Sequence, residues 1–99
     1  MAIVLVDAEN VRRSTWPNIP PAELETLCEE WARARGHEVV VVWEGTSNAD
    51  DRIVGELARL DPPVWVVTSD RELRERVRDR AERVLGGGSF AHKLVGKDR

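Results

Sequence analysis

Consecutive apolar positions predict the strands of this chain. The predicted strands are residues 2–6, 38–43 and 64–68, in which apolar residues follow one another without regular polar alternation, and a short fourth strand at residues 83–85. Such runs are typical of strands that are covered on both faces, as in a parallel sheet. We therefore expect buried strands, with β-branched residues prominent in their centres.

Helical periodicity appears between the predicted strands. Apolar residues recur at intervals of three and four within residues 21–35 and again within residues 49–60, as on the inner face of a helix. Asn48 is expected to cap the second of these helices. The capping box Ser69-x-x-Glu72 is expected to begin a third helix directly after the third strand.

Two segments are expected to be irregular. Residues 11–20 are polar and broken by prolines, which predicts a loop over the ends of the strands. The run Gly86-Gly87-Gly88 predicts a flexible turn, and Ser89 is the expected cap of a terminal helical turn.

The alternation of strands and helices predicts a three-layer α/β/α sandwich with a central parallel sheet of about four strands. Right-handed crossovers place helices on both faces of such a sheet. We expect one domain over residues 1–99 and the strand order 2-1-3-4. In that order the first and third strands are neighbours, which brings Asp7 toward Asp70.

Charge and composition narrow the function only slightly. A net charge of −3 over 99 residues does not indicate a general nucleic-acid binder, so any polyanion site is local. The single cysteine, Cys28, excludes an internal disulfide and permits a reducing compartment. No signal-peptide pattern and no apolar run of about 20 residues is present. We expect a cytoplasmic location without membrane contact.

Carboxylates follow three of the predicted strands, namely Asp7, the pair Asp50-Asp51, and Asp70. The carboxyl ends of parallel strands share one edge of the sheet, where α/β folds bind ligands. Capping explains the last three individually, because they fall in first turns of helices. Asp7 is different, since the residues after it show no helical pattern. Clustered carboxylates suit Mg²⁺ or Mn²⁺ and therefore phosphodiester chemistry.

Taken in order, these motifs resemble the NYN domain of the YacP-like branch, part of the PIN-like nuclease superfamily. The resemblance extends from residue 3 to about residue 94. It rests on Val6-Asp7-x-x-Asn10-Val11, Asn48-Ala49-Asp50-Asp51-x-Ile53, Val66-Val67-Thr68-Ser69-Asp70-Arg71 and Gly86-Gly87-Gly88-Ser89-Phe90. It implies a PIN-like sandwich and a metal-dependent ribonuclease, with RNA as substrate and Mg²⁺ or Mn²⁺ as cofactor.

The resemblance also implies roles for individual residues. Asp7, Asp50 and Asp70 correspond to metal ligands, and Asn10 to the amide that supports them. Asp51 is an alternative ligand. Many PIN-like nucleases carry a further acid on an inserted helix, for which this chain offers only Glu9 or Glu44.

Residues beside the acidic motifs are candidates for substrate binding. Arg12 and Arg13 follow the first motif, and Arg71 follows the third, so these arginines are expected to position phosphates. Ser69 is a candidate to orient a ligand or water. Trp16, in the polar loop, is a candidate to stack a base.

Two other function classes remain open. A catalytically inactive PIN-like module that binds RNA or protein would keep the acids as helix starts. A receiver-like signalling domain shares the topology, but its partner lysine has no counterpart here except Lys93, which lies after the glycine turn. The sequence does not decide whether the substrate is RNA or DNA, or whether cleavage is endonucleolytic or exonucleolytic. It also leaves open whether one or two metal ions are bound and whether the chain forms a homo-oligomer.

Overall fold

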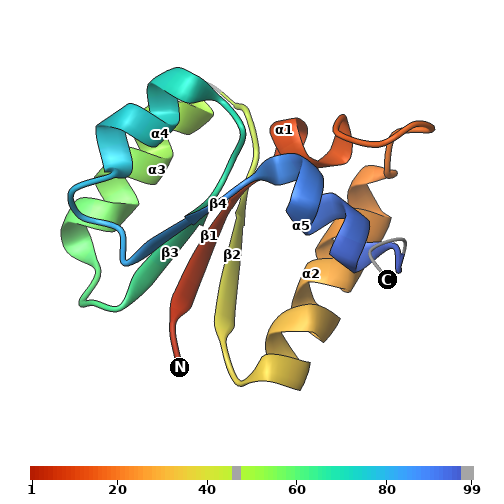
Figure 1. Ribbon diagram of the computed structural model, residues 1–99, viewed down its shortest axis with the longest axis horizontal. Helices are drawn as coiled ribbons and strands as arrows, with labels where there is room; N and C mark the ends of the chain where they lie inside the picture. The colour runs from red at the N-terminus through yellow and green to blue at the C-terminus, as the bar shows by residue number, and fades with distance from the viewer. Residues whose placement is uncertain (46–47, 97–99) are drawn as a thin grey trace.

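A four-stranded parallel sheet forms the centre of the computed structural model, which describes residues 1–45 and 48–96 (Figure 1). The strands are β1 (Ile3–Asp7), β2 (Glu38–Val42), β3 (Val64–Val67) and β4 (Arg83–Leu85). Their order is β2-β1-β3-β4, and every neighbouring pair is parallel. The predicted order 2-1-3-4 is therefore confirmed, and β1 and β3 lie side by side.

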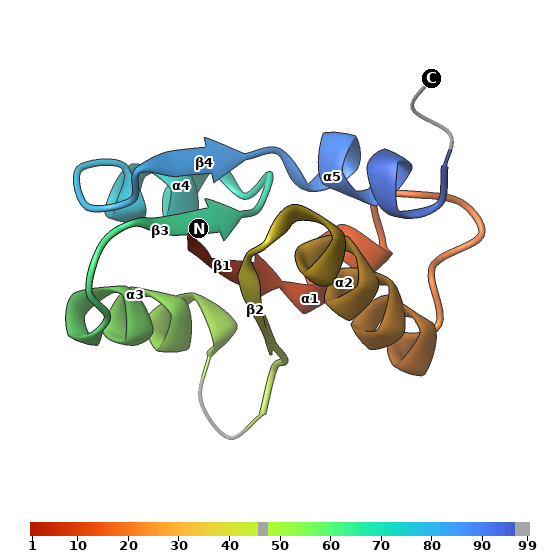
Figure 2. The same ribbon diagram turned by 90° about the horizontal axis from the view of Figure 1, so that it is seen from below.

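Helices cover both faces of this sheet, which confirms the three-layer architecture. The helices are α1 (Ala8–Arg12), α2 (Pro21–Arg35), α3 (Ala49–Arg59), α4 (Arg71–Val77) and α5 (Gly87–Leu94). Figures 1 and 2 show α3 and α4 on one face and α1, α2 and α5 on the other. Among residues 1–45 and 48–96, no helix has both the length and the hydrophobicity to cross a membrane.

The central strand β1 contributes to a hydrophobic core on each face. Val4 and Val6 pack in one cluster with Phe90 of α5, whereas Leu5 packs in the other cluster with Ile53 of α3. These five side chains are buried. Alternate residues of a strand point to opposite faces, so a strand between two helical layers needs an uninterrupted apolar sequence.

The expectation of full burial is wrong for β2, because this strand forms an edge of the sheet. Val42 packs with Ala49 and Ile53 in the core under α3. Val40 lies two residues earlier on the same face and is 37% exposed. An apolar run of this kind indicates a strand, but it does not distinguish an edge strand from a central one.

The segment after β1 also differs from the prediction. Residues 8–12 form the short helix α1, whereas an irregular segment was expected. Ala8 and Val11 are both fully buried in the core that α2 and α5 share. Packing of these two side chains stabilises a helix that is too short to show a clear periodicity.

Two other helices begin at residues that the sequence patterns did not indicate. Asp70, not Ser69, caps α4, because its side chain accepts a hydrogen bond from the Leu73 amide at 3.0 Å. Helix α5 begins at Gly87, so Ser89 lies inside its first turn and does not cap it. The prediction for α3 is confirmed, since the Asn48 side chain accepts from the Asp50 amide.

Candidate functional site

Five carboxylates line one open pocket at the carboxyl edge of the sheet. The pocket has a volume of about 370 Å³ and is lined by Asp7, Glu9, Asn10, Arg13, Ser14, Glu44, Asp50 and Asp70. These residues come from the end of β1, from α1 and the two residues after it, from the segment after β2, from the first turn of α3 and from the cap of α4. The parallel sheet thus brings together acids that are up to 63 positions apart in the sequence.

Asp7 is the most enclosed of these acids, with only 6% of its surface exposed. It occupies the position that precedes α1, but its side chain makes no capping hydrogen bond. Its Oδ2 atom instead accepts a hydrogen bond of 2.8 Å from the Thr68 hydroxyl on the neighbouring strand. Helix capping therefore does not account for a carboxylate at this position.

The surroundings of Asp7 disfavour its ionised form. Burial raises the pKa of Asp7 most strongly, and the negative charges of Asp50, Asp70 and Glu44 raise it further. The hydrogen bond from Thr68 opposes these effects, because it stabilises the carboxylate. The pocket therefore concentrates negative charge around a poorly solvated group, and a bound cation would relieve this repulsion.

Asp50 and Asp70 both lie at the start of a helix, but only Asp70 caps its helix. Burial raises the pKa of Asp50, as does the charge of Asp70, while Arg76 opposes the shift. Asn48 is the cap of α3, so the Asp50 side chain is not needed for that purpose. Asp70 is exposed and does cap α4 through its Oδ1 atom.

A chain of hydrogen bonds joins Asn10, Ser69 and Gly87 beside the acids. The Asn10 Oδ1 atom accepts from the Ser69 amide at 2.9 Å, and the Ser69 hydroxyl accepts from the Gly87 amide at 2.7 Å. A Cβ atom added at Gly87 would lie only 2.3 Å from Asn10 Oδ1. Asn10 therefore holds the β3–α4 connection in place, and the close approach requires glycine at residue 87.

Thr68 and Gly87 are the two structural contributors that sequence reasoning missed. Thr68 is fully buried, donates to Asp7, and accepts from the Asp70 amide at 3.1 Å. A polar residue at the end of an apolar strand was the available sign, the same one that singled out Asp7. Gly87 could not be distinguished from Gly86 and Gly88, because its role depends on how closely α5 approaches α1.

Glu9 and Arg13 line the acidic pocket, whereas Arg12 does not. Glu9 forms ion pairs of 3.1 Å with both Arg12 and Arg13, which neutralise its charge. Arg13 is exposed and lines the acidic pocket. The Arg12 Nε atom donates to the Ile19 carbonyl at 3.0 Å, so Arg12 holds the loop after α1 and does not line the pocket.

The remaining predicted residues do not line the acidic pocket. Asp51 forms a 3.0 Å ion pair with Arg76 and does not line it. Ser69 and Arg71 line a neighbouring open pocket together with Arg74 and Arg78. Trp16 is 84% exposed on the loop between α1 and α2, and its predicted stacking on a base stays a prediction.

Carboxylates are the type of ligand that a hard cation such as Mg²⁺ prefers, but those of this pocket are not grouped closely enough to enclose one. Within the described ranges, no three or more histidine, cysteine, aspartate or glutamate side chains are grouped so that they could hold a metal ion. Mg²⁺ commonly keeps several water ligands and uses only one or two carboxylates. The pocket therefore fits a hydrated Mg²⁺ or Mn²⁺, and it does not fit an ion enclosed by protein ligands alone.

Comparisons with known proteins identify the fold. No family model matches the chain, and no curated protein sequence matches it. Among solved structures, the chain is similar to the crystal structure of a mutant of Rae1 (YacP) from Bacillus subtilis, with a TM-score of 0.82. The match covers 100% of this chain and 78% of the other, at 19% sequence identity. The protein therefore has a YacP-like α/β fold.

Proposed function

We propose that the protein hydrolyses RNA phosphodiester bonds at the acidic pocket, with Mg²⁺ or Mn²⁺ as cofactor. The observation that carries the proposal is the placement of Asp7, a buried carboxylate without a capping role, beside Asp50 and Asp70 in one open pocket. The ordered motifs resemble a family of ribonucleases, and the YacP-like fold agrees with that resemblance.

In this proposal Asp7 and Asp50 are the principal cation-binding carboxylates, with Asp70 contributing the oxygen that does not cap α4. When bound, the cation neutralises phosphate charge and makes water a better nucleophile. Thr68 orients the Asp7 carboxylate through its hydroxyl. Arg13, at the exposed rim, is placed to attract a phosphate of the substrate.

The proposal is tested with a short labelled RNA, incubated with the wild type, Asp7→Asn and Asp79→Asn in Mn²⁺ or in EDTA. Asp79 is an exposed acid that does not line the acidic pocket, so its variant controls for the loss of one charge. We expect cleavage by the wild type and by Asp79→Asn in Mn²⁺ only. Equal cleavage by the wild type and Asp7→Asn, or no cleavage by the wild type, would contradict the proposal.

A catalytically inactive RNA-binding module is the second candidate. It is favoured by the capping role of Asp70 and by the lack, over the described part of the chain, of three metal-binding side chains grouped together. This module would bind RNA without cleaving it, and Mn²⁺ would leave its melting temperature unchanged. A cation site predicts a higher melting temperature in Mn²⁺, because the ion binds the folded state.

A further inference from the structure

A second pocket, rich in aromatic and basic side chains, lies on the sheet face that α2 and α5 cover. It has a volume of about 260 Å³ and is formed by α2, His37, β3, β4 and α5. Among the described residues that line it, none carries a carboxylate. Its chemistry is therefore opposite to that of the acidic pocket. Pockets for drug-sized ligands measure roughly 300–1,000 Å³, so this smaller pocket suits a group no larger than about one nucleotide.

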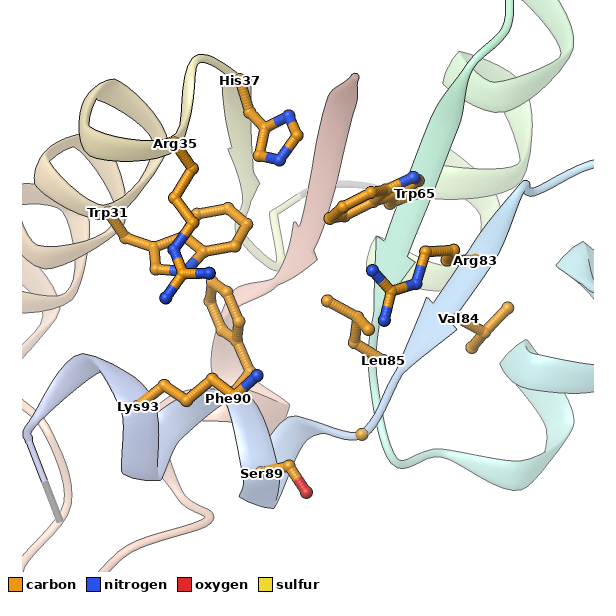
Figure 3. A pocket seen from close by; sticks show the side chains of 11 residues that line it. Trp31, Arg35, His37, Trp65, Arg83, Val84, Leu85, Ser89, Phe90 and Lys93 are labelled. Atoms are coloured by element: carbon orange, nitrogen blue, oxygen red, sulfur yellow. The ribbon is translucent and has the colours of Figure 1, made fainter. Parts of the chain in front are cut away.

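Aromatic rings form the walls of this pocket. Figure 3 shows Trp31 and Trp65 on opposite sides of it, with His37 near one end. The His37 ring centroid lies 5.6 Å from that of Trp31 and 4.6 Å from that of Trp65, and Phe90 meets Trp31 edge-on at 4.8 Å. Trp31 and Trp65 are only partly buried, so part of each ring remains exposed at the pocket.

Three cations surround these rings. The Arg35 guanidinium lies 6.0 Å from the Trp31 ring, and that of Arg83 lies 4.6 Å from the Trp65 ring. Lys93 of α5 lines the same pocket (Figure 3). All three are exposed, and none forms an ion pair within residues 1–45 and 48–96. The pocket therefore carries three basic side chains without an ion-pair partner among the described residues, while the Glu82 carboxylate borders it by accepting a 2.8 Å hydrogen bond from Trp65 Nε1.

Polar donors are also present in the walls. The His37 Nδ1 atom accepts a hydrogen bond of 3.0 Å from the Ala2 amide, so a neutral His37 carries its proton on Nε2. The Trp31 Nε1 atom is buried and has no hydrogen-bond partner within the part of the chain that the structure describes. The His37 Nε2 atom is a donor suited to the oxygen or ring-nitrogen acceptors of a base, whereas the buried Trp31 Nε1 atom has no accessible surface to offer a ligand.

We propose that this pocket binds one base of single-stranded RNA, together with an adjacent phosphate. Aromatic rings stack on any base, and unpaired arginines attract the phosphate. An acidic peptide would use the cations but not the flat walls. The proposal depends on the proposed function only for naming RNA as the ligand, since the pocket itself requires an aromatic ring and an anionic group.

The two pockets lie on either side of the start of α5. Gly86 and Ser89 line the aromatic pocket, while Gly87 donates to Ser69 and closely approaches Asn10 beside the acids. An RNA strand bound at both pockets would therefore have to cross the start of α5. Binding of a base in the aromatic pocket would position a neighbouring part of the strand at the carboxylates.

The test measures binding of a fluorescein-labelled eight-nucleotide oligouridylate by fluorescence anisotropy in EDTA, where no cleavage is expected. The pocket variant is Arg35→Glu/Arg83→Glu. The control variant Arg33→Glu/Arg80→Glu changes the net charge equally at exposed residues that do not line the pocket. We expect the pocket variant to bind at least about tenfold more weakly than the wild type, and the control to remain within about twofold.

Two outcomes of this comparison would overturn the inference. Equal affinity of the pocket variant and the wild type would remove the pocket from RNA binding. An equal loss of RNA affinity in the pocket variant and the control variant would show that binding depends only on the overall charge of the protein. Circular dichroism spectra and melting curves of both variants establish that they are folded.

Competition identifies the ligand class. Oligoglutamate or polyphosphate of the same net charge should displace the labelled RNA less effectively than unlabelled RNA does, because neither can stack on the rings. Equal competition by either would overturn the proposed base recognition. The binding result is separate from the cleavage assay, so wild-type binding without cleavage in Mn²⁺ would remove the proposed function and leave this inference standing.

Discussion

The Thr68 hydroxyl donates a 2.8 Å hydrogen bond to Asp7 Oδ2, joining the ends of the two central strands. The same hydroxyl accepts from the Asp70 amide. Thr68 therefore connects two of the acids, although it carries no charge. This bond also opposes the effect of burial on the pKa of Asp7.

Thr68→Val is expected to raise the pKa of Asp7 further, because the carboxylate loses its hydrogen-bond donor. The acidic limb of a pH–activity profile that requires ionised Asp7 should then move to higher pH. Leaving the Asp70 amide without its partner should also lower the free energy of unfolding by about 1–3 kcal/mol. Thr68→Ser retains the hydroxyl and is the control. Carboxyl NMR titration of Asp7 measures the pKa directly, and an unchanged value in Thr68→Val would contradict this role.

Asp7→Asn is expected to stabilise the metal-free protein at neutral pH. The pKa of Asp7 is raised in the folded state, so ionisation destabilises the fold as the pH rises from the ordinary pKa through the raised one. Below about pH 4, Asp7 is protonated in both the folded and the unfolded state. The variant and the wild type should then have the same free energy of unfolding. Asparagine can still accept from Thr68. Denaturation at several pH values measures the difference in the free energy of unfolding between Asp7→Asn and the wild type, with Asp79→Asn as control. A difference that does not change with pH would contradict the prediction.

Gly87→Ala is expected to destabilise the protein by about 1–3 kcal/mol, because the new methyl group would overlap Asn10 Oδ1. The same change at Gly88 meets no atom within 4 Å. Since alanine favours a helix, Gly88→Ala should be neutral or stabilising by up to about 1 kcal/mol. Urea denaturation of both variants checks the contrast. Similar stability of the two would show that the approach of α5 to α1 is looser than described.

Cys28 is expected to resist thiol reagents in the folded protein. It is fully buried on α2, and burial raises its pKa to about 12. Only the thiolate reacts readily. Modification by a chromogenic disulfide at pH 8 should therefore be slow in buffer and rapid in denaturant. Fast reaction of the native protein would indicate that α2 opens from the core.

The sequence was sufficient for the strands and the acidic edge, because an apolar run predicts a strand and parallel strands end at one edge. The expected strand order is confirmed by the structure, but the apolar pattern alone does not determine it. It was insufficient where tertiary contacts decide the structure. Helix α1 depends on burial of Val11, and the cap of α4 depends on Ser69 being engaged by Gly87. Trp31 and Trp65 occupy apolar positions that, from the sequence alone, resemble core positions. The structure places both at the margin of the core, where they line a pocket.

The hydrogen bond from Gly87 to Ser69 has a consequence for how the site is assembled. Every acid of the pocket lies within the first 70 residues. The β3–α4 connection that carries Asp70 is held from one side by Asn10 and from the other by Gly87, which follows β4. The last strand and helix contribute no acid to the pocket, yet the chain must be synthesised through residue 87 before these constraints are complete. The start of α5 is therefore a structural component of the acidic pocket.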